Sequence, residues 1–394
     1  MRSVDEHRQV VAGLIRPRSP AAVPVADALG LVLARDVVSG VALPAFDNSA
    51  MDGYAVLAED VAAAGADAPV QLPVAEDIPA GRTDIPVLAP GTAHRIMTGA
   101  PLPTGATAVV PVEATDAGTD VVTVRAGARP GQHIRRAGED VTAGTTVLRT
   151  GQVLTPAALG LAAALGLTEL QVWPRLRVLV VSTGTELVSA GTPLQPGQIY
   201  ESNGVMLAAA VRDAGAEVVA APMAGDDVDA FTAAVRGAGD ADVILTTGGV
   251  SAGAYEVVKD AWTGQVEFVK VAMQPGMPQG AGRVDGTAVI TLPGNPVSAL
   301  VSFEVFVRPA LRAAMGRSDT ERPRRAAVLA EDLTSPRGKR QFRRGVLDGD
   351  SVTSYGPPAS HHLRWLASAN CLLEIDEDTS EVAAGSRVQV WDLR

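Results

Sequence analysis

The stretch Ala241-Asp-Val-Ile-Leu-Thr-Thr-Gly-Gly-Val-Ser-Ala-Gly253 is an apolar run that ends abruptly in a loop rich in glycine and hydroxyl groups. Such a run of aliphatic and β-branched residues bounded by glycine predicts a strand buried on both faces. Gly248 and Gly249 lack the Cβ atoms that would keep a ligand from the backbone, and Thr247 and Ser251 add hydroxyl groups beside exposed N–H groups. This composition is typical of an anion site, although a plain strand-to-helix turn would show the same residues.

Strands and helices are predicted to alternate on both sides of this stretch. Strand patterns occupy 177–182, 217–220 and the neighbourhoods of Phe268 and Val289, and helix patterns follow several of them. This alternation predicts a doubly wound, mostly parallel α/β domain over residues 173–318. We expect Asn203 to cap one helix and Asn295 to cap another that starts at Pro296, leaving free N–H groups in the crevice.

Ligands of such sheets bind beyond the carboxyl ends of the strands. Five loops rich in glycine and polar residues are predicted at these ends, at 182–187, 225–227, 247–253, 274–278 and 292–298. Their convergence predicts one pocket. The candidate substrate-binding residues on these loops are Thr183, Gly184, Gly248, Gly249, Ser251, Pro275, Gly276, Pro293, Gly294, Asn295, Pro296 and Ser298.

The rest of the chain has simpler patterns. Ser3-Val-Asp-Glu6 predicts a capping box for a helix that ends before Pro17. Short β runs at 108–112 and 121–125 predict a β-rich domain, and a helix is expected between Pro156 and Gly166. Beyond a charged linker at 321–325, alternating short strands without a helix-length apolar pattern predict a small, barrel-like C-terminal β domain.

The bulk composition excludes several classes of protein. A formal net charge of −11 disfavours a general nucleic-acid binder, and the single cysteine, Cys371, excludes an intramolecular disulfide framework. The N-terminus has acidic residues where a signal peptide would have basic and apolar ones, and the longest uncharged apolar segment, 157–167, is too short to span a membrane. A cytoplasmic protein without a membrane partner is therefore expected.

Three further motifs point to a known family. They are Phe46-Asp-Asn-Ser-Ala-Met-Asp-Gly-Tyr-Ala55, Arg95-Ile-Met-Thr-Gly-Ala-Pro-Leu-Pro103 and Ile134-Arg-Arg-Ala-Gly-Glu-Asp140. The first resembles the signature of the MoeA family, the molybdopterin molybdenumtransferases, which include the C-terminal domain of gephyrin. The other two are similar to motifs of the same family, and the resemblance covers almost the whole chain.

The resemblance implies both an architecture and an activity. The implied domains are an elongated, discontinuous N-terminal domain (1–52 and 138–172), an inserted β-rich domain (53–137), a molybdopterin-binding α/β domain (173–318) and a C-terminal β domain (319–394). The implied reaction transfers molybdenum from molybdate into adenylylated molybdopterin, with release of AMP, in molybdenum cofactor biosynthesis. Family members form homodimers, so an active site across the subunit interface would explain how residues from different domains reach one crevice.

The resemblance also implies site residues. By motif position, Asp52, Thr98, Glu186, Asp226, Glu256, Pro293 and Pro296 match positions that matter for activity in the family. Carboxylates in an anion-seeking crevice make sense mainly as ligands of a divalent cation, and Mg²⁺ takes one or two carboxylates together with waters and phosphates. Glu186, Asp226 and Glu256 are therefore the predicted Mg²⁺ ligands.

The chain departs from the family at two loops. It has Gly253-Ala-Tyr-Glu256 where a Gly-Asp-Tyr-Asp or Gly-Glu-x-Asp pattern is usual, so Ala254 and Glu256 differ. Gln274 and Met277 stand where many members have lysine, which removes two cations from the proposed anion site. Lys270 or Arg340 could replace that charge, and the basic run Lys339–Arg344 could lie beside the ligand or form a solvated strand face. A low-activity paralogue, a gephyrin-like scaffold and a nucleotide pyrophosphatase are the alternative readings.

Overall fold

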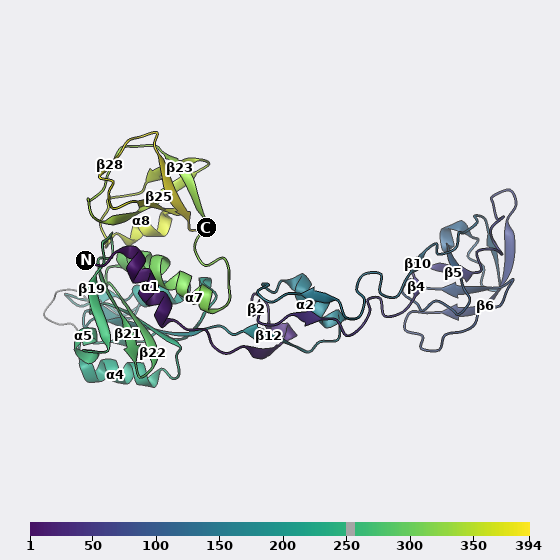
Figure 1. Ribbon diagram of the computed structural model, residues 1–394, viewed down its shortest axis with the longest axis horizontal. Helices are drawn as coiled ribbons and strands as arrows, with labels where there is room; N and C mark the ends of the chain where they lie inside the picture. Colours follow the sequence, from purple (N-terminus) through teal and green to yellow (C-terminus); the bar gives the residue numbers. More distant parts are fainter. Residues whose placement is uncertain (250–256) are drawn as a thin grey trace. The chain divides into compact units, whose positions relative to one another are not determined.

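The computed structural model describes residues 1–249 and 257–394 (Figure 1). The chain forms two compact units, one of residues 1–34, 151–156 and 169–394, the other of residues 35–150 and 157–168. Among the described residues no helix is both long and apolar enough to cross a lipid bilayer.

The first unit is built on a mixed sheet whose strand order is β16-β13-β18-β22-β21-β19, with β17 beside β13. The strands are β13 (Arg177–Thr183), β16 (Glu217–Ala220), β17 (Met223–Ala224), β18 (Val243–Thr247), β19 (Val266–Lys270), β21 (Pro278–Val284) and β22 (Thr287–Leu292). The strands from β16 to β22 in this order are parallel, which confirms the predicted fold class. The opening stretch forms β18, at the centre of the sheet.

An antiparallel hairpin at one edge of the sheet was not predicted. Strand β21 pairs with β22 through the register Val284↔Thr287, so only Asp285 and Gly286 connect them. Both residues have positive φ, at 49° and 85°, as a two-residue type I′ turn requires. Strand β19 is antiparallel to β21 and therefore runs parallel to β22. Its carboxyl end, which leads to residues 274–278, thus lies at the same sheet edge as the other site loops.

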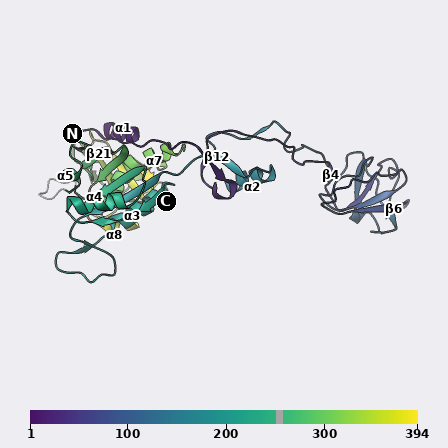
Figure 2. The same cartoon turned by 90° about the horizontal axis from the view of Figure 1, so that it is seen from below.

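Helices cover both faces of this sheet (Figures 1 and 2). Val178 and Val180 of β13 belong to the core that contains the helices of one face, and Leu179 and Val181 belong to the core of the other face. The first face is covered by α1 (Val4–Leu14), α3 (Asn203–Asp213), α6 (Pro296–Ser302), the π-helical segment η3 (Phe303–Val307) and α7 (Arg308–Ala314). The second is covered by α4 (Val228–Gly237) and α5 (Val257–Ala261).

Helix α1 has the predicted capping box, in which the Glu6 amide donates to Ser3 Oγ and the Ser3 amide donates to Glu6 Oε2. The helix ends at its C-cap, Ile15, before Pro17 as expected. Its apolar residues Val4, Val11 and Ile15 lie in the core beneath η3 and α7. The family resemblance groups this helix with the elongated domain, but in the structure it packs on the α/β sheet.

The C-terminal strands form a closed barrel, because β25 pairs with both β26 and β27. Its strands are β23 (Arg324–Leu329), β25 (Arg340–Asp348), β26 (Ser351–Ser354), β27 (Cys371–Ile375) and β29 (Arg387–Asp392), with β24 (Leu333–Thr334) and β28 (Glu381–Val382) paired beside them. This confirms the barrel-like prediction. Strand β20 (Met273–Gln274) adds to β25, so a loop of the α/β domain joins the barrel. Cys371 is buried in the barrel, and burial raises the pKa of its thiol to about 12.

A short helix in the C-terminal region was not predicted from the sequence. Helix α8 (Leu363–Ser368) spans only six residues, of which Leu366 alone is buried. One buried residue gives no helical periodicity, so the sequence pattern carried no signal for it. Helix α8 contacts α6 of the α/β domain and belongs to the chain segment that closes one side of the site.

The second unit contains a five-stranded sheet in the order β8-β5-β7-β6-β9. Its strands are β5 (Gly53–Val56), β6 (Val70–Ile78), β7 (Ala93–Ile96), β8 (Ala108–Pro111) and β9 (Val121–Val124), in agreement with the predicted runs. Its other elements are short: β3 (Val37–Val38), β4 (Asn48–Ser49), β10 (Ile134–Arg135), β11 (Thr146–Leu148) and most of α2 (Pro156–Ala164). Strands β1 (Ala21–Pro24), β2 (Val32–Leu33) and β12 (Glu169–Trp173) belong to the first unit and form a three-stranded sheet in the order β1-β12-β2.

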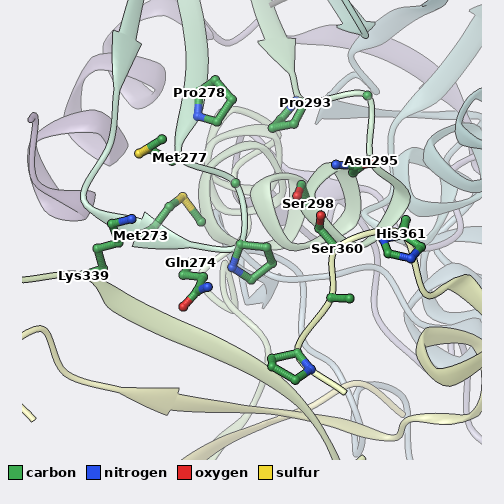
Figure 3. A pocket seen from close by; sticks show the side chains of 15 residues that line it. Met273, Gln274, Met277, Pro278, Pro293, Asn295, Ser298, Lys339, Ser360 and His361 are labelled. Atoms are coloured by element: carbon green, nitrogen blue, oxygen red, sulfur yellow. The ribbon is translucent and has the colours of Figure 1, made fainter. Parts of the chain in front are cut away.

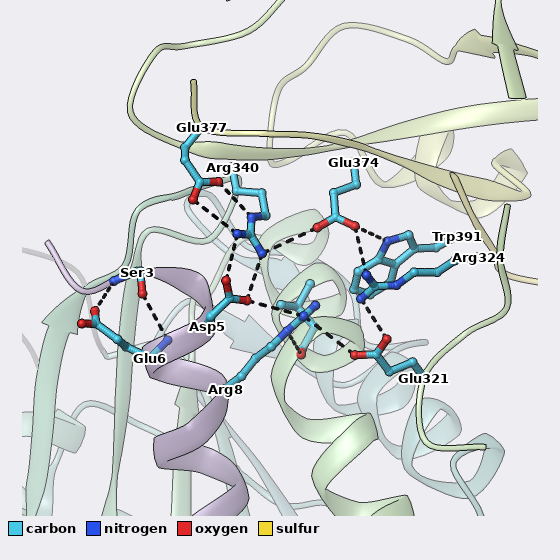
Figure 4. A network of polar contacts seen from close by, with 11 residues as sticks. Ser3, Asp5, Glu6, Arg8, Glu321, Arg324, Arg340, Glu374, Glu377 and Trp391 are labelled. Carbon is cyan, nitrogen blue, oxygen red and sulfur yellow. Dashed lines mark hydrogen bonds and ion pairs between the residues drawn. The ribbon is translucent and has the colours of Figure 1, made fainter. Parts of the chain in front are cut away.

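A network of charged side chains ties α1 to the barrel (Figure 4). The Arg340 guanidinium donates to both carboxylate oxygens of Asp5, at 3.0 Å each, and also pairs with Glu377 at 3.0 Å. Arg8 of the same helix donates to the Val305 carbonyl and lies over the Trp391 ring. The N-terminal helix therefore contacts both the sheet domain and the barrel, and fixes one against the other.

We expect Asp5→Asn to lower stability at pH 7 by about 1 kcal/mol or less, because the Asp5 carboxylate is largely exposed and screened by solvent. The hydrogen bond from Arg340 lowers the pKa of Asp5 from 3.8. Its stabilising contribution is therefore fully present above pH 3.8 and lost as the pH falls through the lower folded value. Thermal unfolding followed by tryptophan fluorescence should separate the variant from wild type at pH 7 and show a smaller difference at an acidic pH below 3.8. An equal difference at both pH values would contradict this assignment.

Candidate functional site

The carboxyl ends of the parallel strands meet in one row. In the strand register Ser182 of β13 lies opposite Thr247 of β18, which lies opposite Leu292 of β22. The loops that follow these strands therefore emerge side by side. The sequence predicts one pocket for five loops, whereas the described residues of these loops line two cavities. Two adjoining cavities open at this edge, and we call them cavity A and cavity B.

Cavity B has a volume of about 620 Å³ and lies over the ends of β13 and β18. Its lining contains most of the predicted substrate-binding residues of the first loops. The lining residues are Ser182, Thr183, Gly184, Glu186, Leu187, Ile199, Tyr200, Glu201, Ser202, Asn203, Asp226, Thr247, Gly248, Gly249, Gly294, Asn295, Pro296, His361 and Leu363. Ser251 and Glu256, which the sequence also assigns to the site, lie outside the described residues.

Hydrogen bonds hold the three loops together. Thr183 Oγ1 donates to the Thr247 carbonyl at 3.3 Å, and Thr247 Oγ1 donates to the Pro293 carbonyl at 3.1 Å. The side-chain amide of Asn203 donates to Thr247 Oγ1 at 3.0 Å and to the Gly294 carbonyl at 2.6 Å. The predicted capping role of Asn203 is wrong, because Ser202 occupies the N-cap position of α3. The Asn203 side chain reaches across the crevice instead and crosslinks two site loops.

Replacing Asn203 with Ala should loosen these loops, because it removes both hydrogen bonds that the side-chain amide donates. A lost hydrogen bond costs about 1–1.5 kcal/mol, so amide hydrogen exchange at the Gly248 N–H, which donates to the Leu292 carbonyl, should accelerate about tenfold. Exchange measured by mass spectrometry over 243–249 and 287–295 would test this. Asn203→Asp is the matched variant, since it keeps the shape but places an acceptor against the Gly294 carbonyl. Unchanged hydrogen exchange in both variants would show that Asn203 does not stabilise the contact between these loops.

The two glycines after β18 are required by the backbone. Gly248 and Gly249 have φ values of 95° and 63°, a region that residues with a side chain rarely adopt. A Cβ at Gly248 would lie 2.6 Å from the Thr183 carbonyl oxygen, and one at Gly249 would lie 2.9 Å from Val258 Cγ2. These glycines therefore allow the loop to pass close to β13 while keeping cavity B open.

Two of the three predicted metal ligands come together at cavity B. Asp226 accepts hydrogen bonds from the Thr185 amide and hydroxyl, at 3.2 and 3.1 Å, so its loop is joined to the Glu186 loop. The Glu186 carboxylate folds back over Gly184, where an added Cβ would lie 2.5 Å from Glu186 Oε2. The neighbouring Asp227 has a different role, because it caps α4 by accepting from the Ala230 amide. Among the described residues no group of three His, Cys, Asp or Glu side chains is close enough to hold a metal by itself.

Two carboxylates are too few to enclose a divalent cation, but they are enough for one that also keeps waters and substrate phosphates as ligands. Mg²⁺ binds through one or two carboxylates and keeps waters and substrate phosphates as its other ligands. Glu186 and Asp226 both line a cavity large enough for a nucleotide-sized ligand, next to the glycine loop. The two described carboxylates therefore fit Mg²⁺ bound together with a substrate phosphate.

Cavity A has a volume of about 490 Å³ and lies between the sheet domain and the barrel (Figure 3). It is lined by Met273, Gln274, Pro275, Gly276, Met277, Pro278, Pro293, Gly294, Asn295, Ser298, Lys339, Pro358, Ala359, Ser360 and His361. The loop after β19 is held in shape by Gln279, whose amide donates to the Gly276 carbonyl and to Ser302 Oγ at 2.6 Å each. Lys339 and His361 are the ionisable side chains among these lining residues.

The start of α6 differs from its prediction. Asn295 does occupy the N-cap position before Pro296, but its side chain makes no capping hydrogen bond. The Val297 amide donates to the Ser360 carbonyl at 3.0 Å, so this N–H group is not free for a ligand. The barrel segment that carries Ser360 covers the helix start. Asn295 and Ser298 nevertheless line cavity A, as the sequence predicts for substrate-binding residues.

The basic run of β25 is mostly occupied by protein contacts. Arg340 is bound by Asp5 and Glu377, so it does not replace the missing lysines. Arg344 is buried and donates to the carbonyls of Pro357, Ala359 and His362, which fixes the segment 357–362. Lys270 is exposed at the end of β19 and lies outside both cavity linings. Lys339, at the start of the run, is the member that lines cavity A.

The predicted residues Asp52 and Thr98 lie in the second unit and contact each other. Asp52 Oδ1 accepts from the Thr98 amide at 2.6 Å and from the Thr98 hydroxyl at 2.7 Å. These two hydrogen bonds lower the pKa of the Asp52 carboxyl, with a smaller contribution from Arg95. Two motifs separated in sequence therefore form one small acidic site, with the Asp52 side chain held in a fixed orientation.

Several lining residues were missed by sequence reasoning. Glu201 accepts from Ser182 Oγ at 2.9 Å and from the Gly204 amide at 2.6 Å, which anchors Tyr200 beside cavity B. His361 comes from the barrel region, whose packing on the sheet no local pattern reveals, whereas Lys339 belongs to the basic run for which the sequence already offered a place beside the ligand. The polar segment Tyr200-Glu-Ser-Asn203 directly before a helix was the one available signal.

Comparison with known proteins places these motifs in a family. The chain matches the MoeA N-terminal region (domain I and II) over residues 2–166, a probable molybdopterin binding domain over 179–313 and the MoeA C-terminal region (domain IV) over 326–393. It is 69% identical to molybdopterin molybdenumtransferase 2 of Mycobacterium tuberculosis, with 100% of both chains covered. It is 40% identical to molybdopterin molybdenumtransferase 1 of the same organism, over 99% of this chain and 98% of that protein. Its structure resembles a molybdopterin biosynthesis MoeA protein from Pyrococcus horikosii, with 30% identity, a TM-score of 0.82 and coverage of 100% and 99%.

Proposed function

The chain belongs to the MoeA family of molybdopterin molybdenumtransferases, and on this premise we propose that it inserts molybdenum from molybdate into adenylylated molybdopterin with release of AMP. The observation that carries the proposal is the pair of adjoining cavities that share the wall formed by Gly294, Asn295 and His361. One cavity contains carboxylates and a glycine loop, and the other contains a lysine and no acidic lining residue among those described. A reaction between a nucleotide-linked substrate and a separate oxyanion needs two such environments, one for each ligand.

Cavity B is the proposed site for the phosphates of the adenylylated substrate. Glu186 and Asp226 would hold Mg²⁺ there, which would neutralise phosphate charge and polarise the phosphate that AMP carries away. The protein itself contributes by positioning the Mg²⁺ ligands and the substrate phosphates. The Thr185 contacts hold Asp226, and the open backbone at Gly248 and Gly249 lets the phosphates approach the β18 loop. Glu256 remains the third predicted ligand.

Cavity A is the proposed site for molybdate. Lys339 supplies a positive charge, and Ser298 and Asn295 supply neutral hydrogen-bonding groups. Gln274 and Met277, which replace the lysines common in the family, both line this cavity. The loss of two cations leaves a weaker field for a dianion. We therefore propose a transferase that needs more molybdate for half-maximal rate than a family member with both lysines.

The test of the function is molybdenum cofactor formation by the purified protein from adenylylated molybdopterin, molybdate and Mg²⁺. Cofactor is scored by reconstitution of a molybdoenzyme, and AMP is measured by chromatography. We expect both products to appear together and Gln274→Lys with Met277→Lys to lower the molybdate requirement. A folded wild-type protein that forms neither product, with the lysine variant equally inactive, would favour a scaffold over an enzyme.

We also propose that the protein is a homodimer in which Asp52 and Thr98 of one subunit complete the crevice of the other. Support comes from their family motifs and from the contact that orients the Asp52 carboxylate. Light scattering on the purified protein should give twice the mass of one 40.4 kDa chain. A fully active monomer would contradict the proposal. A cytoplasmic location and the absence of nucleic-acid partners stay predictions from the sequence.

A further inference from the structure

One histidine stands on the wall between the two cavities. Gly294, Asn295 and His361 line both of them, and His361 is the ionisable member of the three. Figure 3 shows its ring beside Asn295 at the edge of cavity A. No sequence motif selects this residue, because it lies in the C-terminal barrel region, far along the chain from the glycine loops.

The charges on the two sides of His361 are opposite. Among the described lining residues, cavity B contains the carboxylates of Glu186, Glu201 and Asp226, whereas cavity A contains Lys339 and no carboxylate. A divalent cation with phosphates suits the first environment, and an oxyanion without a cation suits the second. A side chain at this boundary can contact ligands in both cavities. If it is positively charged, it can bind an oxyanion in cavity A and a phosphate in cavity B.

The backbone around His361 is held firmly. Arg344 donates to the carbonyls of Ala359 and His362, at 3.3 and 3.0 Å, and also to that of Pro357. The Ser360 carbonyl accepts from the Val297 amide. The His361 ring also packs edge-on against the His362 ring, with 4.4 Å between centroids. Because the segment is fixed from both the barrel and α6, the imidazole is presented to the cavities without a large ordering cost on binding.

We propose that His361, in its imidazolium form, binds the tetrahedral oxyanion in cavity A and orients it toward the phosphate end of the substrate in cavity B. This inference rests on the proposed function and adds a binding residue to it. The other charged groups that line the two cavities are Glu186, Glu201 and Asp226 in cavity B and Lys339 in cavity A. The His362 ring packs against His361, and Arg344 donates to the His362 carbonyl. Histidine is the side-chain type that ordinarily changes charge near neutral pH, and His362 lines neither cavity, so we expect oxyanion binding to depend on pH through His361.

The experiment measures the binding of molybdate by calorimetry between about pH 6 and pH 8, the range in which histidine side chains titrate. Sulfate serves as a second probe, because it is a tetrahedral dianion that does not condense. We expect wild-type affinity to fall as the pH rises. His361→Gln should bind about tenfold more weakly at pH 6 and show no pH dependence, whereas His361→Lys should keep tight binding without pH dependence. Lys339→Met should bind more weakly at every pH and retain the pH dependence.

The outcomes separate the inference from the function on which it rests. If wild type binds molybdate and His361→Gln keeps the same affinity and pH dependence, His361 is not the binding group, and the proposed function is unaffected. If wild type binds neither molybdate nor sulfate, the assignment of cavity A fails together with the inference. Circular dichroism checks the fold of each variant. If His361→Gln does not fold, the comparison of wild type with His361→Lys decides, because equal pH dependence in these two overturns the proposal. His133→Asn, in the second unit, is the control and should bind as wild type does.

Discussion

Glu186→Gln is expected to lower the rate of AMP release by about 100-fold at limiting Mg²⁺ and to raise the Mg²⁺ concentration needed for half-maximal rate. The substitution keeps the shape of the side chain and removes the charge that would hold the cation beside the substrate phosphates. Asp226→Asn should behave in the same way. Its Oδ2 accepts two hydrogen bonds from Thr185, so the variant also tests whether the loop stays in place.

Asp227→Asn is the matched control for these two variants. It removes one negative charge next to Asp226, but asparagine is as good a helix cap as aspartate and can still accept from the Ala230 amide. Its rate and Mg²⁺ dependence should stay within about twofold of wild type. Binding of Mn²⁺, followed by electron paramagnetic resonance, gives a readout that is independent of activity and should weaken in Glu186→Gln and Asp226→Asn alone. Equal Mg²⁺ dependence and equal Mn²⁺ binding in all four proteins would exclude these carboxylates as ligands.

The second large effect is recovery of activity in a mixed dimer. Asp52→Asn and Glu186→Gln should each be nearly inactive as homodimers, since each damages every active site. If one site takes Asp52 from one subunit and Glu186 from the other, a mixed dimer has one intact site. Random pairing of equal amounts gives half mixed dimers, so about one quarter of wild-type activity should return. Asparagine at position 52 still accepts from the Thr98 amide, so the local structure should hold.

The control pairs Glu186→Gln with Asp226→Asn. Both residues line the same cavity of one subunit, so no arrangement of these two chains produces an intact site. Coexpression with two different affinity tags allows each mixed dimer to be purified before assay, and the purified dimer of Asp52→Asn with Glu186→Gln should then have about half of wild-type activity, because one of its two sites is intact. Recovery in the first mixture and none in the second supports a shared site. Absence of recovery in the first, or equal recovery in both, would place Asp52 outside the active site of the partner subunit.

Local sequence patterns were sufficient for most elements of the α/β domain, but not for its edge hairpin. The apolar run before Gly248 forms the central strand, because burial on both faces leaves an uninterrupted hydrophobic pattern. Ser3 and Glu6 marked the start of α1, since a capping box involves residues only three apart. The edge hairpin was missed although Asp285-Gly286 carries a turn signal, because the preceding Gly280 and Gly282 weaken the strand pattern.

The candidate site was predictable only in part. Glycine loops at parallel strand ends meet by topology, so Thr183, Gly248 and Pro293 could be brought together from the sequence. The contact of Asp52 with Thr98 joins two motifs that the family resemblance had already singled out. The third carboxylate, Glu256, lies outside the described residues, and its role as a metal ligand stays a prediction.

The sequence by itself determined the fold class, the family and two of the carboxylates that line the crevice, Glu186 and Asp226, because each depends on local periodicity or on contiguous motifs. Tertiary structure alone decided that Asn203 crosslinks two loops, that Arg340 binds Asp5 of the first helix, and that Lys339 and His361 reach the cavities. These contacts join residues 44 to 335 positions apart. No periodicity links such positions, since their proximity depends on how the barrel and α1 pack against the sheet domain.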